Sequence, residues 1–322
     1  MTTKLQLKEV GSLSEKMLEQ VERAVVGKRE ALELVLLGLL ADGHVLIEDY
    51  PGLAKTLIAR SFAQVSSMKF ARIQFTPDLM PSDVTGGSIY SQRDGAFKFQ
   101  PGPAFTNLLL GDEINRAPPK TQAALLEAMQ ERQITIDGET HRLDPPFLVL
   151  ATQNPIEYEG TYPLPEAQLD RFLLKIELRM PERDAEIEVL RRHAAGFDPR
   201  DLAAAGVHAV ASLDDLAAAR AEVQKVTVDD AVLGYIADVC RATRSAPSTA
   251  LGVSPRGATA LVATSRAWAW LSGRSFVTPD DVKTLSASTL RHRIKLRAEA
   301  ELEGVTPTSV LDGVLASVPV PR

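Results

Sequence analysis

Short apolar segments alternate with helical segments through the first half of the chain. Five segments have the length and apolar character of buried strands, and they span residues 44–48, 70–75, 105–110, 146–152 and 172–178. Apolar residues recur at helical spacing over residues 14–40 and again over residues 56–65. Buried strands that alternate with helices are typical of a parallel sheet covered on both faces. The first half is therefore predicted to form an α/β domain with one doubly wound, five-stranded parallel sheet.

Two segments interrupt this alternation. Residues 88–99 and 134–140 each contain an Asp-Gly pair between short alternating stretches. An Asp-Gly pair in that setting is a strong signal for a β-hairpin. Both hairpins are expected to lie outside the parallel sheet, where they could contact another molecule.

The strand pattern ends at Pro181, and helical stretches follow it. They are separated at residues 196–199, 245–255 and 278–281. At the last of these, Thr278 is placed to cap a helix that has Pro279 in its first turn. We expect residues 1–181 to form the α/β domain and residues 182–322 to form a smaller all-helical domain.

Composition limits the class of protein. The formal net charge of -6 argues against a general nucleic-acid-binding or anionic-membrane surface. The longest apolar run, residues 34–40, is too short to cross a bilayer, and the first ten residues lack the apolar core of a signal peptide. Cys240 is the single cysteine, so it has no disulfide partner within the chain, and we interpret it as a small buried hydrophobe. These features predict a cytoplasmic protein.

Residues 49–56 have the context of a phosphate-binding loop, because they join a predicted strand to a predicted helix. Backbone N–H groups at the start of that helix would face phosphate oxygens. Lys55 would reach the β- and γ-phosphates, and the Thr56 hydroxyl would ligate Mg²⁺. Asp49 and Ala54 stand where the usual motif has glycine, and alanine is acceptable there if its φ is negative. The alternative is an ordinary solvated helix N-terminus.

A second motif follows the strand at 105–110, where an apolar run ends in Asp112 and Glu113. The strand would deliver both carboxylates to the sheet edge at which the phosphate-binding loop lies. There Asp112 would hold Mg²⁺ and Glu113 would polarise the attacking water. A solvated acidic turn is the alternative for this pair alone. The two motifs together, in one sheet, favour nucleotide hydrolysis.

With both loops placed, nearly the whole chain resembles the AAA+ superfamily and, within it, the MoxR family of the helix-2-insert branch. The most specific stretches are residues 111–117, 122–131, 151–155, 163–172 and 254–256. The resemblance implies a P-loop AAA+ core followed by a helical lid domain, with ATP and Mg²⁺ as cofactors. Members of this family often lack P-loop glycines, so Asp49 and Ala54 are compatible with the site.

The resemblance also assigns roles to single residues. The implied nucleotide-binding residues are Val26, Gly27, Pro51, Gly52, Leu53, Ala54, Lys55, Thr56 and Leu57, with the first two beside adenine. Asn154 matches sensor 1, which orients the lytic water with Glu113, and a turn cap before Pro155 is its alternative. Arg171 matches the arginine finger of a neighbouring subunit, or it forms a surface pair with Asp170. Arg256 matches sensor 2 on the lid, or it pairs with a nearby carboxylate.

The resemblance implies a nucleotide-dependent hexamer that remodels protein complexes in the manner of a chaperone, with a von Willebrand factor A domain protein as partner and a role in cofactor or metal insertion. The hairpins would face the pore or one rim of that ring, where Phe97 and Phe99 could grip a client or simply pack. Three alternatives are a magnesium-chelatase-type motor, a DNA-directed motor and a nucleotide-gated scaffold that does not hydrolyse. The mixed charges of the hairpins disfavour DNA.

Overall fold

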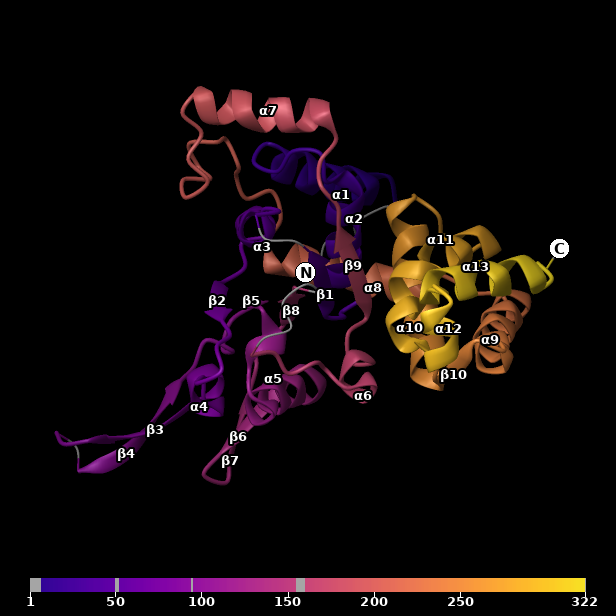
Figure 1. Ribbon diagram of the computed structural model, residues 1–322. Helices are drawn as coiled ribbons and strands as arrows, with labels where there is room; N and C mark the ends of the chain where they lie inside the picture. Colours follow the sequence, from indigo (N-terminus) through magenta and orange to yellow (C-terminus); the bar gives the residue numbers. More distant parts are fainter. Residues whose placement is uncertain (1–6, 50–51, 94, 155–159, 322) are drawn as a thin grey trace.

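A five-stranded parallel sheet lies at the centre of the protein (Figure 1). The computed structural model describes residues 7–49, 52–93, 95–154 and 160–321. The strands are β1 (Val45–Asp49), β2 (Phe70–Gln74), β5 (Leu108–Asp112), β8 (Leu148–Gln153) and β9 (Leu174–Leu178), in the order β2-β5-β8-β1-β9. Every neighbouring pair is parallel. The prediction of one five-stranded parallel sheet is confirmed.

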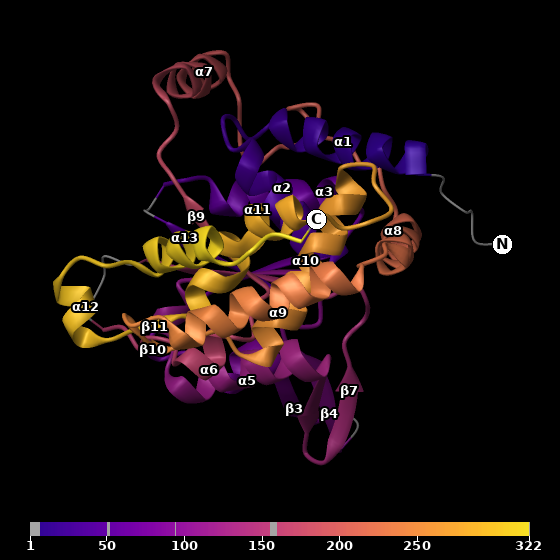
Figure 2. The same ribbon diagram turned by 90° about the vertical axis from the view of Figure 1, so that its right-hand side faces the viewer.

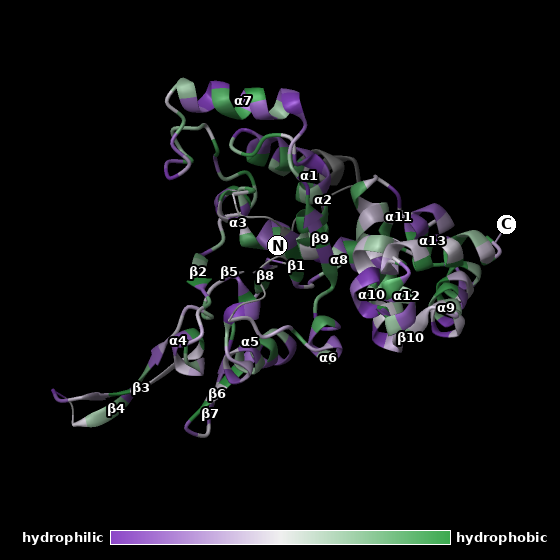
Figure 3. Ribbon diagram, viewed as in Figure 1, coloured by the Kyte–Doolittle hydropathy of each residue, from purple (hydrophilic) through white to green (hydrophobic). Residues whose placement is uncertain are grey.

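Helices cover both faces of this sheet because successive strand residues point to opposite sides. Leu108 and Leu110 of β5 pack with α1 (Leu7–Glu22), α2 (Arg29–Leu40) and α3 (Lys55–Val65). Leu109 packs on the other side with α5 (Pro119–Glu131). Figure 3 shows apolar and polar residues alternating along the helices, α7 among them.

Two predicted boundaries were wrong. The helical pattern over 14–40 is broken between α1 and α2, where Gly27 has a φ of +67°. A Cβ added at Gly27 would lie only 2.6 Å from the Cβ of Ala185. The strand predicted over 105–110 instead begins at Leu108. Thr106 donates to the Lys69 carbonyl at 2.8 Å and Asn107 to the Pro146 carbonyl at 3.0 Å, so these residues tie the entry turn to its neighbours.

Both predicted hairpins are confirmed. One consists of β3 (Gly86–Ser91) and β4 (Ala96–Pro101), and the other of β6 (Gln133–Ile136) and β7 (Glu139–Arg142). They extend away from the sheet on the same side of the molecule (Figure 1). Phe99 stacks on His141 with ring centroids 3.9 Å apart, so the two hairpins contact each other. Phe97, in contrast, is 72% exposed.

The C-terminal part is helical, as the sequence predicted (Figure 2). Its helices are α7 (Arg183–Ala194), α8 (Leu213–Lys225), α9 (Asp230–Ser245), α10 (Pro255–Leu271), α11 (Pro279–Leu290), α12 (Ala298–Leu302) and α13 (Pro307–Ser317). A short antiparallel ladder of β10 (Thr249–Leu251) and β11 (Lys295–Leu296) was not predicted, because strands of two and three residues carry no readable alternation. The Thr278 hydroxyl caps α11, as expected, by accepting from the Asp281 N–H.

The division between residues 181 and 182 stays a prediction. The segment that follows it returns to the sheet domain: Arg192 of α7 donates to the Glu22 carbonyl at 3.1 Å. Farther along, the Val210 N–H donates to the Val65 carbonyl at 2.9 Å. Across the described ranges, none of the helices has the length and apolar character needed to span a membrane.

Candidate functional site

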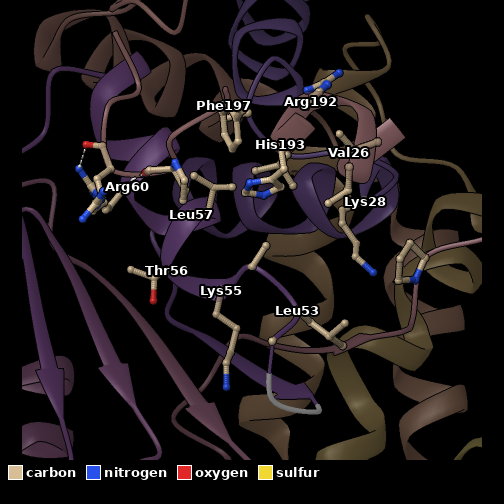
Figure 4. A pocket seen from close by; sticks show the side chains of 18 of the residues that line it. Val26, Lys28, Leu53, Lys55, Thr56, Leu57, Arg60, Arg192, His193 and Phe197 are labelled. Atoms are coloured by element: carbon tan, nitrogen blue, oxygen red, sulfur yellow. Dashed lines mark hydrogen bonds between the residues drawn. The ribbon is translucent and has the colours of Figure 1, made fainter. Parts of the chain in front are cut away.

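A cavity of about 990 Å³ opens at the carboxyl ends of β2 and β5, beside the loop that follows β1. The loop at residues 52–54, the start of α3 and the ends of both strands form its polar part. Residues before α2, together with α7 and the chain after it, form the other part, where apolar side chains lie among charged ones such as Lys28 and Arg192. Figure 4 shows Leu57, His193 and Phe197 around that part, with Lys55 and Thr56 farther along the pocket. The two ends therefore differ in chemistry.

The loop before α3 has the turned backbone of an anion-binding loop. Gly52 has a φ of +88° and Ala54 a φ of +62°, and both line the cavity with Leu53. The condition under which alanine would be acceptable here, a negative φ, is not met. Alanine here adopts the left-handed conformation that glycine takes at little cost, directly before α3 begins at Lys55. Pro51 and the Asp49 side chain lie outside the described part.

Asp112 is the most heavily contacted carboxylate of the cavity. Its Oδ1 accepts from the Thr152 hydroxyl at 2.7 Å and lies 3.6 Å from Lys55 Nζ, while its Oδ2 accepts from Arg72 Nη2 at 2.8 Å. Burial works against ionisation of this carboxyl. The hydrogen bonds from Thr152 and Arg72 and the charge of Lys55 outweigh burial and hold the pKa of Asp112 below its usual value. The group is thus kept as a carboxylate.

Glu113 follows Asp112 in a left-handed conformation, with φ 58° and ψ 51°. Its N–H donates to the Thr152 hydroxyl at 2.9 Å, and its carboxylate accepts from Arg116 Nη1 at 3.2 Å. A non-glycine residue in this region is strained, and such strain persists where the surrounding structure fixes it. The turn brings the Glu113 side chain into the wall of the cavity beside Asp112.

The oxygen groups of this wall fit Mg²⁺ that arrives with phosphates. Thr56 supplies a hydroxyl and Asp112 a carboxylate, both at the polar end of the cavity. Magnesium sites of this kind use one or two carboxylates together with substrate phosphates and water. Within the described ranges, no cluster of three or more His, Cys, Asp or Glu forms a self-contained metal cage. The site therefore suits a metal ion that is shared with the substrate.

The other residues predicted to act in catalysis are not among those that line this cavity. Asn154 is buried directly after β8. Arg171 and Arg256 line a second cavity of about 310 Å³, together with Arg293. The alternative partner of Arg171, Asp170, accepts instead from Arg293 Nε at 2.6 Å and from the Ser254 hydroxyl at 3.1 Å.

Sequence reasoning missed part of the first cavity. Val26, which the resemblance places beside adenine, lines it, whereas Gly27 lies close to Ala185. His193 and Phe197, which line it, were missed because α7 was assigned to the other domain, and nothing in a mixed helix pattern points to a cavity wall. Arg72 was missed too, although a polar residue inside a strand of the central sheet was a readable signal.

Comparisons with known proteins agree with this geometry. Residues 44–174 match the "ATPase family associated with various cellular activities (AAA)", and residues 241–314 match the AAA lid domain. The chain is 47% identical to "Uncharacterized protein YeaC" of Bacillus subtilis, over 95% of this chain and 94% of that protein. It is 42% identical to "Chaperone MoxR1" of Mycobacterium tuberculosis, over 96% of this chain and 82% of that protein.

A solved structure from Cytophaga hutchinsonii superposes with a TM-score of 0.90 at 40% identity, and the match covers 98% of this chain and 97% of that one. Fold, cavity and matches together define an AAA ATPase with a helical lid, an enzyme that hydrolyses ATP. Within that class, the chain belongs to the MoxR family.

Proposed function

We propose that the large cavity binds Mg-ATP with the phosphates at Lys55 and the adenine against Val26, Leu57, His193 and Phe197. The observation that carries this proposal is the presence, in one cavity, of a helix N-terminal lysine and threonine beside two strand-end carboxylates. Apolar and aromatic side chains suit a purine, and backbone N–H groups with a lysine suit phosphates.

In this proposal each polar residue has one task. Lys55 neutralises the β- and γ-phosphates, and Thr56 and Asp112 hold Mg²⁺, which supplies positive charge to the transferring phosphoryl group. Glu113 orients a water and accepts its proton. Asn154 helps to position that water, since an amide can contact water and phosphate without adding charge.

Arg171 and Arg256 complete the site from a neighbouring subunit. Their place in the second cavity, away from Lys55, supports this role, because neither lines the cavity that holds their own chain's carboxylates. A guanidinium beside the γ-phosphate stabilises the charge that develops during transfer. The arrangement requires a closed ring, for which we propose a nucleotide-dependent hexamer.

We further propose that the ring remodels protein complexes in the cytoplasm with a von Willebrand factor A domain partner, and that it serves cofactor or metal insertion. The name of the Mycobacterium relative supports a chaperone role. The exposed Phe97 on the projecting hairpin offers an apolar contact for a client. A magnesium-chelatase-type or DNA-directed motor is the alternative. Two measurements separate these roles. The first is the rate of ATP turnover with added DNA or with an added candidate A-domain protein, and the second is an assay of metal insertion into a tetrapyrrole.

The first test is nucleotide binding by Lys55→Ala. Removing a charge that pairs with phosphate is expected to weaken ATP binding by at least ~10-fold, since one charge-assisted hydrogen bond contributes ~1.5–3 kcal/mol. Lys120→Ala, on an exposed position of α5, is the matched control and should bind ATP like the wild type. Equal affinities of the two variants would place the phosphates elsewhere.

A further inference from the structure

Arg72 is a cation of the large cavity to which the mechanism above gives no task. It lies in the middle of β2, and its side chain is 45% exposed. Its Nη2 donates to Asp112 Oδ2 at 2.8 Å and to Gln74 Oε1 at 2.9 Å. Arg72 is therefore hydrogen-bonded to the carboxylate that is proposed to hold Mg²⁺.

The contacts of Asp112 show which partner can be exchanged. Thr152 is fully buried, and its hydroxyl is fixed from two sides because it donates to Asp112 and accepts from the Glu113 N–H. The exposed side chain of Arg72 can leave without disturbing the core. A divalent cation that approaches Asp112 would meet the like charge of Arg72, and like charges at short range repel strongly in a partly buried site.

The order of the strands locates Arg72 relative to the phosphates. The phosphate-binding loop follows β1, Asp112 and Glu113 end β5, and Arg72 lies on β2, one strand farther from β1. A phosphate chain that begins at the loop and ends near Glu113 would bring its last phosphate closest to Arg72. The α-phosphate and the base lie toward the opposite end.

The local charges also allow Arg72 to exchange the Asp112 carboxylate for a phosphate group. Lys55, Arg72 and Arg116 carry positive charge near the carboxylates of Asp112 and Glu113, and the sum is one excess positive charge. A planar guanidinium binds carboxylate and phosphate with the same geometry. Gln74, on the same face of β2, can keep its contact with the guanidinium while the other partner changes.

We propose that Arg72 recognises the γ-phosphate: it neutralises Asp112 when no nucleotide is bound, and it moves to the terminal phosphate when Asp112 takes up Mg²⁺. Arg72 thereby makes the site prefer ATP over ADP. This inference rests on the proposed Mg-ATP site and adds a residue that distinguishes the two nucleotides.

The test compares equilibrium affinities for Mg-ATP and Mg-ADP in full-length protein that carries Glu113→Gln to slow turnover. Adding Arg72→Ala is expected to weaken ATP binding ~10-fold or more, the scale of one lost charge-assisted hydrogen bond, and to leave ADP binding nearly unchanged. Arg72→Lys should restore part of the preference for ATP. Arg142→Ala, which changes an exposed arginine of β7, is the matched control.

A second readout is the Mg²⁺ concentration for half-maximal binding of ADP, which should fall in Arg72→Ala because no cation competes for Asp112. An unchanged ATP-to-ADP affinity ratio overturns the inference. Equal weakening of both nucleotides with a lower melting temperature also overturns it, since that pattern indicates a purely structural role. If Arg72→Ala does not fold, Arg72→Gln is measured in the same way. If Arg72→Ala does not change the preference for ATP over ADP, the binding of ATP by Lys55→Ala still tests the proposed nucleotide site separately.

Discussion

The two cavities described above differ in the elements that supply their charged groups. The larger one places Lys55 and Arg72 against the carboxylates of Asp112 and Glu113, so cations and anions are combined in one wall. The smaller one gathers arginines, Arg171 and Arg256 among them. Its own carboxylates are engaged by other arginines, since Asp42 lies 2.8 Å from Arg220 and Asp170 lies 2.6 Å from Arg293.

This difference has a physical consequence. A lysine and a hydroxyl at a helix start beside two strand-end carboxylates can hold Mg-ATP, whereas a cavity whose own carboxylates are already paired with arginines favours an anion supplied from outside. We infer that the larger cavity binds the substrate and that the smaller one meets the γ-phosphate of a neighbour's substrate. Binding and hydrolysis should therefore be separable by mutation.

The largest expected effect is on turnover and belongs to the first cavity. Glu113→Gln should bind ATP normally and hydrolyse it at least ~100-fold more slowly, because an amide cannot accept the proton of the attacking water. Glu127→Gln, on an exposed position of α5, is the matched control and should leave the rate unchanged. Rates are measured at saturating ATP. Near wild-type turnover by Glu113→Gln would remove the catalytic assignment.

A smaller effect on stability tests whether the second cavity is independent of nucleotide binding. His44 lines that cavity, accepts from the Val149 N–H at Nδ1 and is 3.0 Å from the Met129 carbonyl at Nε2. Burial, helped by the charge of Arg132, lowers the pKa of His44 to about 3. Below pH ~6.5 the unfolded chain takes up a proton that native His44 refuses, so acid lowers the free energy of unfolding down to pH ~3.

His44→Phe leaves the Val149 N–H and the Met129 carbonyl without this partner. It should lower the free energy of unfolding at pH 7 by ~1–3 kcal/mol for each of these groups that stays unpaired. It should also make the loss of stability between pH 6.5 and 4 shallower, while ATP affinity stays unchanged. The remaining slope includes buried His292, whose pKa is lowered in the same direction by burial. Denaturant unfolding across this pH range is the measurement, with exposed His208→Phe as control. A parallel loss of ATP affinity would show that the cavities are not independent.

The smallest effect concerns the loop of the first cavity. Ala54→Gly should raise the free energy of unfolding by up to ~1 kcal/mol, because it removes a left-handed alanine that costs ~1–2 kcal/mol and adds the flexibility cost of glycine, ~0.5–1 kcal/mol. Ala123→Gly, at an exposed position inside α5, should instead destabilise by ~1 kcal/mol. Thermal unfolding of both variants gives the signs, and a destabilising Ala54→Gly would contradict the backbone conformation described for the loop.

The comparison also shows what the sequence could predict. The first cavity was readable where residues of one local motif carry it, since Lys55 and Thr56 follow a strand and Asp112 and Glu113 end another. Arg72 and Phe197 reach the same cavity from segments whose approach depends on strand order and on the path of the chain after β9. That path is a tertiary property without a local signal.

Strand number and both hairpins were predicted because burial and Asp-Gly turns act locally. The break at Gly27 was not, since its positive φ is enforced by packing near Ala185, far along the chain. Cys240 was predicted as a buried hydrophobe, and burial raises the pKa of its thiol to about 11. The grouping of Arg171 with Arg256 could not be predicted, since it depends on how α10 packs against α2.

We propose that Glu113 of one subunit and Arg171 of the next form one hydrolytic site. Arg171→Ala should bind ATP and barely hydrolyse it, whereas Arg241→Ala, at an exposed position of α9, should hydrolyse normally. The decisive measurement is the ATPase rate of mixtures of Arg171→Ala and Glu113→Gln, with subunit exchange confirmed independently. At equal amounts about a quarter of the interfaces in a closed ring carry both intact residues. If Arg171 acts on the neighbouring subunit's site, the ATPase rate has a maximum near the equal mixture. A rate that stays at the level of the separate variants at every ratio, or normal hydrolysis by Arg171→Ala alone, would contradict it.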